Sequence, residues 1–357
     1  MSILVAMSGG VDSSVTAYLM REKYKICKGA TMLLFLNEAL GVLSKTCCSL
    51  ENINDARKIC ELLGIEHEVL NYMNEFEECV IRKFVNVYES GGTPNPCIDC
   101  NKFMKFEAFL GHANEIGLEK IATGHYAKIE RDSSGHYLLR KAKDLSRDQS
   151  YVLYMLTQEQ LAHTEFPLGD MNKSDARNLA EELGFVNARK HDSQDICFVP
   201  DGDYANFIET YTGKKYQPGN FINKSGKILG THDGIVHYTI GQRRGLGIPA
   251  KSRLYISDIN INDNTITLSE QSLLTRKISI INANLIALPE LPKNYQARVK
   301  VRYRQKELPA TINQTSPEEF IIEFSEAIKA PARGQAAVIY DNDYVIGGGT
   351  IADIIVT

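Results

Sequence analysis

A glycine-rich stretch near the N-terminus, Ser8-Gly-Gly-Val-Asp-Ser-Ser14, constrains the fold of this chain more than any other feature. It follows the apolar run Ile3–Met7, which is short enough for a buried strand, and it precedes Val15–Met20, which can continue as a helix. Glycines let the backbone approach an oxyanion, and the first N–H groups of a helix lack partners within that helix. The stretch therefore predicts a phosphate site between a strand and a helix.

This loop lacks the lysine of a Walker loop, so the usual transfer of a terminal phosphate is not expected. It resembles the pyrophosphate loop of ATP pyrophosphatases, which adenylate a substrate and release pyrophosphate. The resemblance implies ATP and Mg²⁺ as cofactors, with Asp12 near the magnesium ion and the leaving group. The alternative is an ordinary Gly-Gly turn, which the position directly after an N-terminal strand disfavours.

The N-terminal part of the chain alternates between apolar strands and amphipathic helices. The pattern predicts further strands at 29–36, 66–70 and 120–123, and helices at 47–64, 76–87 and 102–116. This alternation is typical of an α/β doubly wound parallel sheet. In such sheets ligands bind at the carboxyl ends of the strands, where the Ser8–Ser14 loop would lie.

From about residue 211 onward the helical periodicity gives way to strand and hairpin patterns. Hairpins are predicted at 220–230 and 255–268, and strands at Gln296–Arg304, 320–324, 336–340 and 344–346. We therefore expect an ATP-pyrophosphatase-type catalytic domain at 1–210, followed by two small all-β domains. These are a central β domain at 211–277 and a C-terminal β-barrel domain at 278–357.

Composition narrows the class of protein. The chain has no run of about 18 apolar residues that could span a membrane, and its N-terminus carries no export signal, so a cytoplasmic protein is expected. Eight cysteines without an export signal favour reduced thiols, some of them catalytic or metal-binding. The net charge of −4 does not indicate a nucleic-acid binder, so any RNA contact must come from local basic surfaces.

Two cysteines three residues apart, Cys97 and Cys100, lie in a proline-fixed loop that leads into a predicted helix. A thiol near a helix N-terminus and beside Lys102 has its reactive thiolate favoured by the helix dipole and the charge. Cys100 is better placed for this than Cys97. The alternative to a reactive thiol is that Cys97 and Cys100 form half of a structural zinc site, with Cys47 and Cys48 as the other half.

Several segments together resemble the bacterial tRNA-specific 2-thiouridylases, in that family's order and over nearly the whole chain. They are the Ser8–Ser14 loop, Thr93-Pro-Asn-Pro-Cys-Ile-Asp-Cys-Asn-Lys102, Thr123-Gly-His-Tyr-Ala127, Asp148-Gln-Ser-Tyr151, Ser193-Gln-Asp-Ile-Cys-Phe198, Gly241-Gln-Arg-Arg-Gly-Leu-Gly247 and Gly347-Gly-Gly-Thr-Ile351. The resemblance implies that ATP adenylates the 2-carbonyl oxygen of the wobble uridine in certain tRNAs, with release of pyrophosphate. Sulfur then arrives as a persulfide on Cys197, from a cysteine desulfurase or a sulfur-relay protein.

In that family the cysteine matching Cys100 frees or delivers the sulfur and forms a disulfide with Cys197 as AMP leaves. A second thiol is also what a persulfide needs to release sulfide or to resolve the bond. Some members have Asp where this chain has Cys97, so the role of that Asp is not transferred. In an alternative mechanism, Cys97, Cys100 and Cys197 hold three corners of a four-iron cluster whose free iron accepts sulfide.

The resemblance also implies contacts with both substrates. The residues that would line ATP are Ala6, Met7, Ser8, Gly9, Gly10, Val11, Asp12 and Ser13, with Met32 and Gly124 beside the adenine. The residues that would contact tRNA are His125, Arg147, Asp148, Gln149 and Gln335. For His125 the alternative is a hydrogen-bonded histidine at a strand end, and for Arg147–Gln149 it is a plain polar loop.

A run of alternating cations indicates RNA binding without any appeal to the resemblance. Its members are Arg298, Lys300, Arg302, Arg304 and Lys306. Side chains alternate along a strand, so these cations would share one face, where like charges repel one another and suit a phosphate backbone. A solvated strand face is the alternative. We predict tRNA contacts at Arg302, Tyr303 and Arg304.

Two other classes of protein compete with this interpretation. A ligase that adenylates a small molecule would explain the ATP loop but would leave the paired cysteines and the basic run without a role. A non-catalytic RNA-binding or iron–sulfur carrier protein would not need Asp12.

Overall fold

The computed structural model describes residues 1–36, 50–190 and 196–355, and it forms two compact units. The first unit comprises Met1–Val80, Cys97–Gly202 and Asp343–Ile346, and the second comprises Ile81–Pro96, Asp203–Asn342 and Gly347–Thr357. Within the described ranges, none of the helices has the length and apolar character needed to cross a bilayer.

The first unit is built on a sheet whose neighbouring strands are all parallel, in the order β3-β2-β1-β4-β7. Its strands are β1 (Ser2–Ala6), β2 (Ile26–Leu33), β3 (His67–Asn71), β4 (Lys120–Ala122) and β7 (Thr164–Glu165). The chain moves from β1 outward to β3 and then returns to β4 on the other side of β1. This reversal beside β1 is where open α/β sheets bind ligands. The predicted doubly wound parallel sheet is confirmed.

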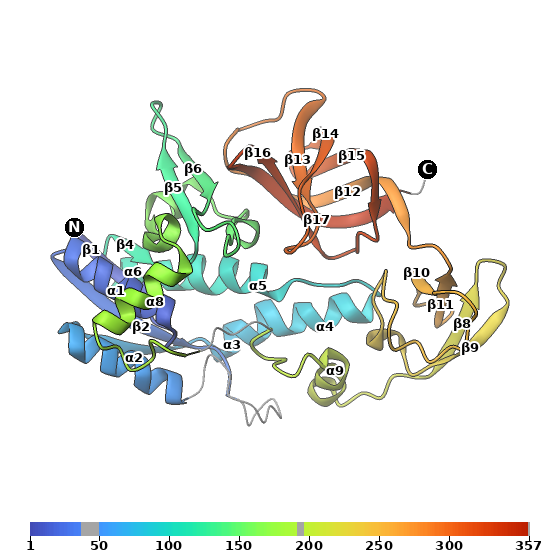
Figure 1. Ribbon diagram of the computed structural model, residues 1–357, viewed down its shortest axis with the longest axis horizontal. Helices are drawn as coiled ribbons and strands as arrows, with labels where there is room; N and C mark the ends of the chain where they lie inside the picture. The colour runs from blue at the N-terminus through green and yellow to red at the C-terminus, as the bar shows by residue number, and fades with distance from the viewer. Residues whose placement is uncertain (37–49, 191–195, 356–357) are drawn as a thin grey trace. The chain divides into compact units, whose positions relative to one another are not determined.

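Three helices gather over one face of this sheet: α1 (Val11–Lys23), α2 (Leu50–Leu63) and α8 (Lys173–Glu182) (Figure 1). Alternate residues of β1, Ile3 and Val5, join their buried apolar side chains in one cluster. Because this cluster fixes α1 and α8 against the same strand, it holds the starts of both helices beside the end of β1.

The other helices of the first unit differ in part from the prediction. The helix predicted at 102–116 begins earlier, as α5 (Pro96–Asp99), continues as the π-helical segment η2 (Cys100–Ala108) and ends as α6 (Phe109–Glu115). Proline is tolerated at a first helical position, where its missing N–H would have no helical partner. The unit also contains α3 (Met73–Phe76), α7 (Gln158–Ala162), the 3₁₀ turns η3 (Ser150–Val152) and η4 (Pro167–Asp170), and part of the π-helical η1 (Glu77–Ile81).

A hairpin that was not predicted follows β4. It consists of β5 (Ala127–Arg131) and β6 (Tyr137–Lys141), paired antiparallel. Two residues near the C-terminus of the chain, Tyr344 and Val345, pair with β6 and so belong to the first unit.

The second unit begins with two helices joined by aromatic rings, α4 (Arg82–Glu89) and α9 (Tyr204–Thr212). Tyr88 stacks on Tyr204 with ring centroids 4.6 Å apart. A four-stranded sheet of order β10-β11-β8-β9 follows in sequence, with the turn η5 (Ile235–His237) between its hairpins. Its strands, β8 (Gly219–Asn223), β9 (Ile228–His232), β10 (Tyr255–Asn260) and β11 (Thr265–Ser269), form the two predicted hairpins.

The C-terminal strands close into a six-stranded barrel of order β12-β15-β14-β13-β16-β17, in which β12 also pairs with β17. They are β12 (Leu274–Leu285), β13 (Tyr295–Lys300), β14 (Leu308–Ser316), β15 (Glu319–Lys329), β16 (Ala336–Asp341) and β17 (Tyr344–Ile355). The predicted β-barrel is confirmed.

The strand predicted at Gln296–Arg304 is wrong at its end, because β13 stops at Lys300. Val299 pairs with Leu308 of the next strand, so the chain must reverse between these two residues. The reversal includes a turn in which the N–H group of Gln305 donates to the carbonyl oxygen of Arg302 at 3.1 Å. The cations after Lys300 are therefore gathered in a loop and do not line one face of a strand.

Candidate active site

The predicted phosphate loop joins β1 to α1, and its own hydroxyl groups hold it in shape. Ser13 Oγ donates to the carbonyl oxygen of Gly10 at 2.9 Å and accepts from the N–H group of Ser8 at 3.2 Å. The amide of Asn187 donates to the carbonyl oxygen of Gly9 and to Ser14 Oγ, both at 2.9 Å. Gly10 is the N-cap residue and has no side chain with which to cap α1. The first N–H groups of the helix are therefore suited to bind an anion.

Two glycines are required by close backbone approaches. Gly9 has a φ of +71°, and a Cβ atom there would lie 2.2 Å from the carbonyl oxygen of Asn52. A Cβ atom on Gly124 would lie 3.0 Å from the carbonyl carbon of Asp12. Gly124 follows β4, so the tight approach places the end of that strand directly against the start of α1.

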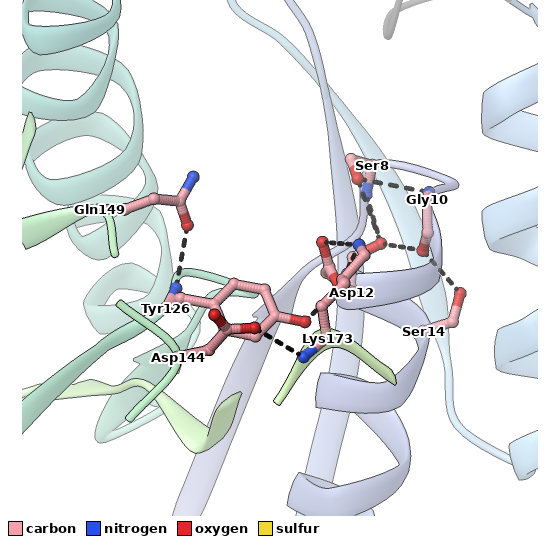
Figure 2. Close-up of polar contacts among 9 residues, drawn as sticks. Ser8, Gly10, Asp12, Ser14, Tyr126, Asp144, Gln149 and Lys173 are labelled. Atoms are coloured by element: carbon pink, nitrogen blue, oxygen red, sulfur yellow. Dashed lines mark hydrogen bonds and ion pairs between the residues drawn. The ribbon is translucent and has the colours of Figure 1, made fainter. Parts of the chain in front are cut away.

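The Asp12 carboxylate is held by two side chains from distant parts of the chain (Figure 2). Lys173 Nζ lies 2.8 Å from Oδ1 and 2.7 Å from Oδ2. The Tyr126 hydroxyl donates to Oδ1 at 2.9 Å. The Lys173 side chain is 9% exposed and that of Asp12 is 30% exposed. The ion pair is therefore shielded, yet one side of the carboxylate remains open to a substrate.

A loop after β6 holds both of these partners. Gln149 Oε1 accepts from the N–H group of Tyr126 at 2.9 Å, and the N–H group of Gln149 donates to the carbonyl oxygen of Tyr126 at 2.9 Å. Asp144 Oδ2 accepts from the N–H group of Lys173 at 3.1 Å (Figure 2). Hydrogen bonds, first that from the Ser146 hydroxyl, keep the pKa of Asp144 below its ordinary value, so Asp144 is an ionised acceptor.

His125 is buried at the end of β4. Its Nε2 lies 3.4 Å from Lys105 Nζ and its Nδ1 lies 2.7 Å from the Thr123 hydroxyl oxygen. Because an ammonium group can only donate, Nε2 must accept, and Nδ1 then carries the proton of the neutral ring. Burial, followed by the charge of Lys105, lowers the pKa of His125 well below 6.5.

We expect the free energy of unfolding to decrease as the pH falls below about 6.5. The pKa of His125 is depressed in the folded state, so the unfolded chain binds the proton first, and stability is lost from the unfolded pKa down to the folded one. Urea titrations across this range should give a shallower decrease for His125→Asn than for the wild type. His67 and His232, whose pKa values are also lowered first by burial, contribute equally to both curves. Equal slopes would contradict the expectation.

The cysteines of interest all belong to the first unit. Cys97 lies in α5 and is exposed, whereas Cys100 begins η2 and is half-buried. Asn101 fixes this segment, because its amide donates to the carbonyl oxygen of Val152 at 3.1 Å. Cys197 is half-buried beside Phe198, whose ring packs edge-on against Phe76 with centroids 5.8 Å apart. Both half-buried thiols are thus anchored by buried neighbours.

Known protein families and relatives match this chain over nearly its whole length. The family model described as the tRNA methyl transferase HUP domain matches residues 1–201. The tRNA methyl transferase PRC-barrel domain matches residues 205–270, and the aminomethyltransferase beta-barrel domain matches residues 275–351. The chain is 44% identical to tRNA-specific 2-thiouridylase MnmA of Clostridioides difficile, over 98% of this chain and 97% of that protein. The protein of the same name from Lachnoclostridium phytofermentans is 42% identical over 98% of this chain and 99% of its own length. The chain belongs to the tRNA-specific 2-thiouridylase family.

Within this 2-thiouridylase, the residues predicted to bind ATP lie at or near the carboxyl ends of β1, β2 and β4. Ala6 ends β1, the loop that follows it leads into α1, and Gly124 abuts the start of α1. Met32 lies near the carboxyl end of β2, which pairs with β1. These positions match the carboxyl edge at which a ligand was expected.

Metal ligation is not evident in the described ranges, where no group of three or more His, Cys, Asp or Glu side chains is arranged to hold an ion. Cys97, Cys100 and Cys197 are all described, and they do not form such a group. Cys47 and Cys48, the suggested second half of a zinc site, lie outside the described residues. Mg²⁺ needs only one or two carboxylates besides substrate phosphates, and the open side of Asp12 fits that requirement.

The residues predicted to contact tRNA lie in both units. In the first unit, Asp148 is buried and accepts hydrogen bonds within its own loop, while Arg147 and Gln149 are half-buried. In the second unit, Arg302, Tyr303 and Arg304 are exposed in the loop after β13. The Gln335 amide donates to the carbonyl oxygens of Thr93 and Pro94 at 2.9 and 3.0 Å.

Sequence reasoning missed the residues that support the phosphate loop. Lys173 and Tyr126 hold Asp12, Asn187 braces the loop, and Asp144 braces Lys173. The available signal was weak: Tyr126 lies within the Thr123–Ala127 segment, and Lys173 follows an Asn that reads as a helix N-cap.

Proposed function

We propose that this chain catalyses the ATP-dependent 2-thiolation of the wobble uridine of tRNA, with release of AMP and pyrophosphate. The observation that carries the proposal is the Asp12 carboxylate at the phosphate loop, which Lys173 and Tyr126 hold in place. The chain also carries the thiols Cys100 and Cys197 and is similar over its full length to tRNA-specific 2-thiouridylases. The reaction would take place in the cytoplasm, where tRNA is used. The chain would comprise three domains, the catalytic domain at 1–210 and the two β domains at 211–277 and 278–357.

Adenylation would take place at the phosphate loop. Ala6–Ser13 would bind the triphosphate, and Met32 and Gly124 would lie beside the adenine. Asp12 would hold Mg²⁺, which supplies charge neutralisation for the departing pyrophosphate. Attack of the uridine 2-carbonyl oxygen on the α-phosphate would form a C2–O–AMP bond and break the bond to pyrophosphate.

Sulfur transfer would use the two half-buried thiols. A cysteine desulfurase or a relay protein would load Cys197 as a persulfide. Cys100 thiolate would attack the Cys197 sulfur, so that a Cys100–Cys197 disulfide forms and the outer sulfur leaves with both electrons of the broken S–S bond. That sulfur would attack C2 and expel AMP. A thiol reductant must reduce the disulfide before the next turnover.

Recognition of tRNA would use residues of both units. We propose contacts by His125, Arg147, Asp148, Gln149, Arg302, Tyr303, Arg304 and Gln335. The loop cations would bind phosphates, and Gln335 would approach an unstacked base. The target uridine lies in an anticodon loop, so it can be flipped out without opening a duplex.

The test is thiolation of purified unmodified tRNA by the full chain, with ATP, Mg²⁺ and a cysteine desulfurase with cysteine as the sulfur donor, under exclusion of iron. Mass spectrometry of the digested tRNA should detect 2-thiouridine, and none should form without ATP. Product that forms only after iron reconstitution would support the four-iron mechanism instead.

The same assay separates the competing classes of protein. Pyrophosphate release that does not need tRNA, with no 2-thiouridine under any condition, would indicate a ligase acting on a small molecule. A non-catalytic carrier would form no 2-thiouridine in this assay, and cells that carry Asp12→Ala would keep their thiolated tRNA.

A further inference from the structure

We infer that the loop Ala142–Ser150 couples tRNA binding to nucleotide binding, and that Tyr126 and Lys173 are the positioning residues that transmit the coupling. The inference rests on the proposed function and concerns how the two substrates of that reaction influence each other. Its basis is that this loop binds the backbones of Tyr126 and Lys173, the two residues whose side chains bind Asp12. The two sets of hydrogen bonds form separate routes to the carboxylate.

The first route passes through Tyr126. Gln149 binds this residue on both of its backbone groups, as acceptor from the N–H group and donor to the carbonyl oxygen, each at 2.9 Å. The Tyr126 ring is buried, and its hydroxyl donates to Asp12 Oδ1 at 2.9 Å (Figure 2). A shift of Gln149 therefore displaces the tyrosine backbone, and a buried ring must pass the shift on to the carboxylate.

The second route passes through Lys173. Asp144 accepts from the backbone N–H group of Lys173 at 3.1 Å, and Lys173 Nζ binds both Asp12 oxygens. The N–H group of Arg147 donates to the carbonyl oxygen of Asp144 at 3.0 Å. Arg147 and Gln149 are two of the proposed tRNA contacts. Arg147 is hydrogen-bonded to Asp144, which supports Lys173. Gln149 is hydrogen-bonded to Tyr126, which itself binds Asp12.

The loop has a fixed base and an accessible tip. At the base, Asp148 accepts from the N–H group of Ala142 at 3.0 Å and from the Ser150 hydroxyl at 2.7 Å. At the tip, Leu145 is 68% exposed although it is apolar. A ligand can reach the tip, and the fixed base limits the loop to small displacements, which the two routes deliver to Asp12.

The expected consequence is a thermodynamic coupling between ATP and tRNA. If tRNA alters the position of the Asp12 carboxylate, it must change ATP affinity, and ATP must change tRNA affinity by the same factor. Typical coupling factors are about 5 to 150. Such coupling would favour nucleotide binding in the complex that also holds the acceptor uridine.

The test measures the dissociation constant of a non-hydrolysable ATP analogue, with Mg²⁺, in the absence and the presence of saturating unmodified tRNA. We expect the ratio of the two constants to differ from one by at least about fivefold in the wild-type chain. Tyr126→Phe keeps the ring and removes the hydroxyl, so it interrupts the first route and should move the ratio toward one, while the second route and the tRNA affinity stay unchanged. The matched control is Tyr24→Phe, which removes a hydroxyl that binds Glu165 at 2.7 Å in the same unit and should keep the wild-type ratio.

A wild-type ratio in Tyr126→Phe, or a ratio of one in the wild type, would overturn the inference. If Tyr126→Phe does not fold, Asp144→Ala interrupts the second route and should likewise move the ratio toward one, and a wild-type ratio in that variant would overturn the inference. The thiolation assay is independent of these ratios: 2-thiouridine together with a ratio of one would refute only the coupling. Coupling without 2-thiouridine under any condition would refute only the proposed function.

Discussion

Replacement of Cys100 or Cys197 by serine should abolish 2-thiouridine formation while tRNA adenylation continues. A serine hydroxyl cannot hold a persulfide and cannot accept sulfur in a disulfide exchange, so no 2-thiouridine above background is expected for either variant. The phosphate loop is formed by other residues, so pyrophosphate release should persist. The measurement combines mass spectrometry of the tRNA with a pyrophosphate assay on the same reaction.

Two further cysteine variants make this result specific. Cys79→Ser is the matched control, because Cys79 is also half-buried in the first unit and burial raises the pKa of its thiol, which disfavours the reactive thiolate. It should retain wild-type thiolation. Cys97→Ser should also remain active in the persulfide mechanism, whereas loss of activity in all three variants Cys97→Ser, Cys100→Ser and Cys197→Ser would favour the four-iron mechanism. Thiolation by Cys197→Ser at the wild-type rate would refute both.

The sequence could predict those parts of the fold and site that short segments encode. The strand, glycine loop and helix start at Ile3–Met20 are contiguous, so their order alone predicted a phosphate site. Lys173 and Tyr126 could not be found in this way, because they lie 161 and 114 residues from Asp12 in sequence. Only the crossover of the chain around β1 brings them to the same carboxylate.

Local patterns also failed where tertiary pairing decides the outcome. Alternating cations predicted a long strand through Arg304, yet the pairing of Val299 with Leu308 requires a reversal between them. The apolar spacing after Lys102 predicted a helix, but it could not indicate that the segment from Cys100 would be π-helical. Such segments are frequent at functional sites, and this one begins at a proposed catalytic thiol.

Replacement of Lys173 by methionine should strongly reduce adenylation. Methionine keeps much of the length and apolar stem of lysine but removes the charge that binds both Asp12 oxygens at 2.7 and 2.8 Å. The Tyr126 hydroxyl would then remain as the donor to the carboxylate among the residues drawn in Figure 2, and the carboxylate could reorient. Removal of one preorganised electrostatic group at a reacting centre typically costs about 10²–10³ in rate, and we expect a loss of that size in pyrophosphate release with saturating tRNA.

The proper comparison for Lys173→Met is Lys120→Met, because Lys120 also makes a partly buried ion pair, with Glu165 at 2.8 Å, but does not contact the phosphate loop. If lysine pairing matters only for stability, both variants should lower the melting temperature and neither should change the rate of adenylation at a temperature where both are folded. If Lys173 positions Asp12, the rate should fall in Lys173→Met alone, and Lys173→Arg should restore part of it, since a guanidinium can bind the same two oxygens. Equal adenylation rates for Lys173→Met and Lys120→Met would show that the Asp12 carboxylate keeps its catalytic position without the ion pair.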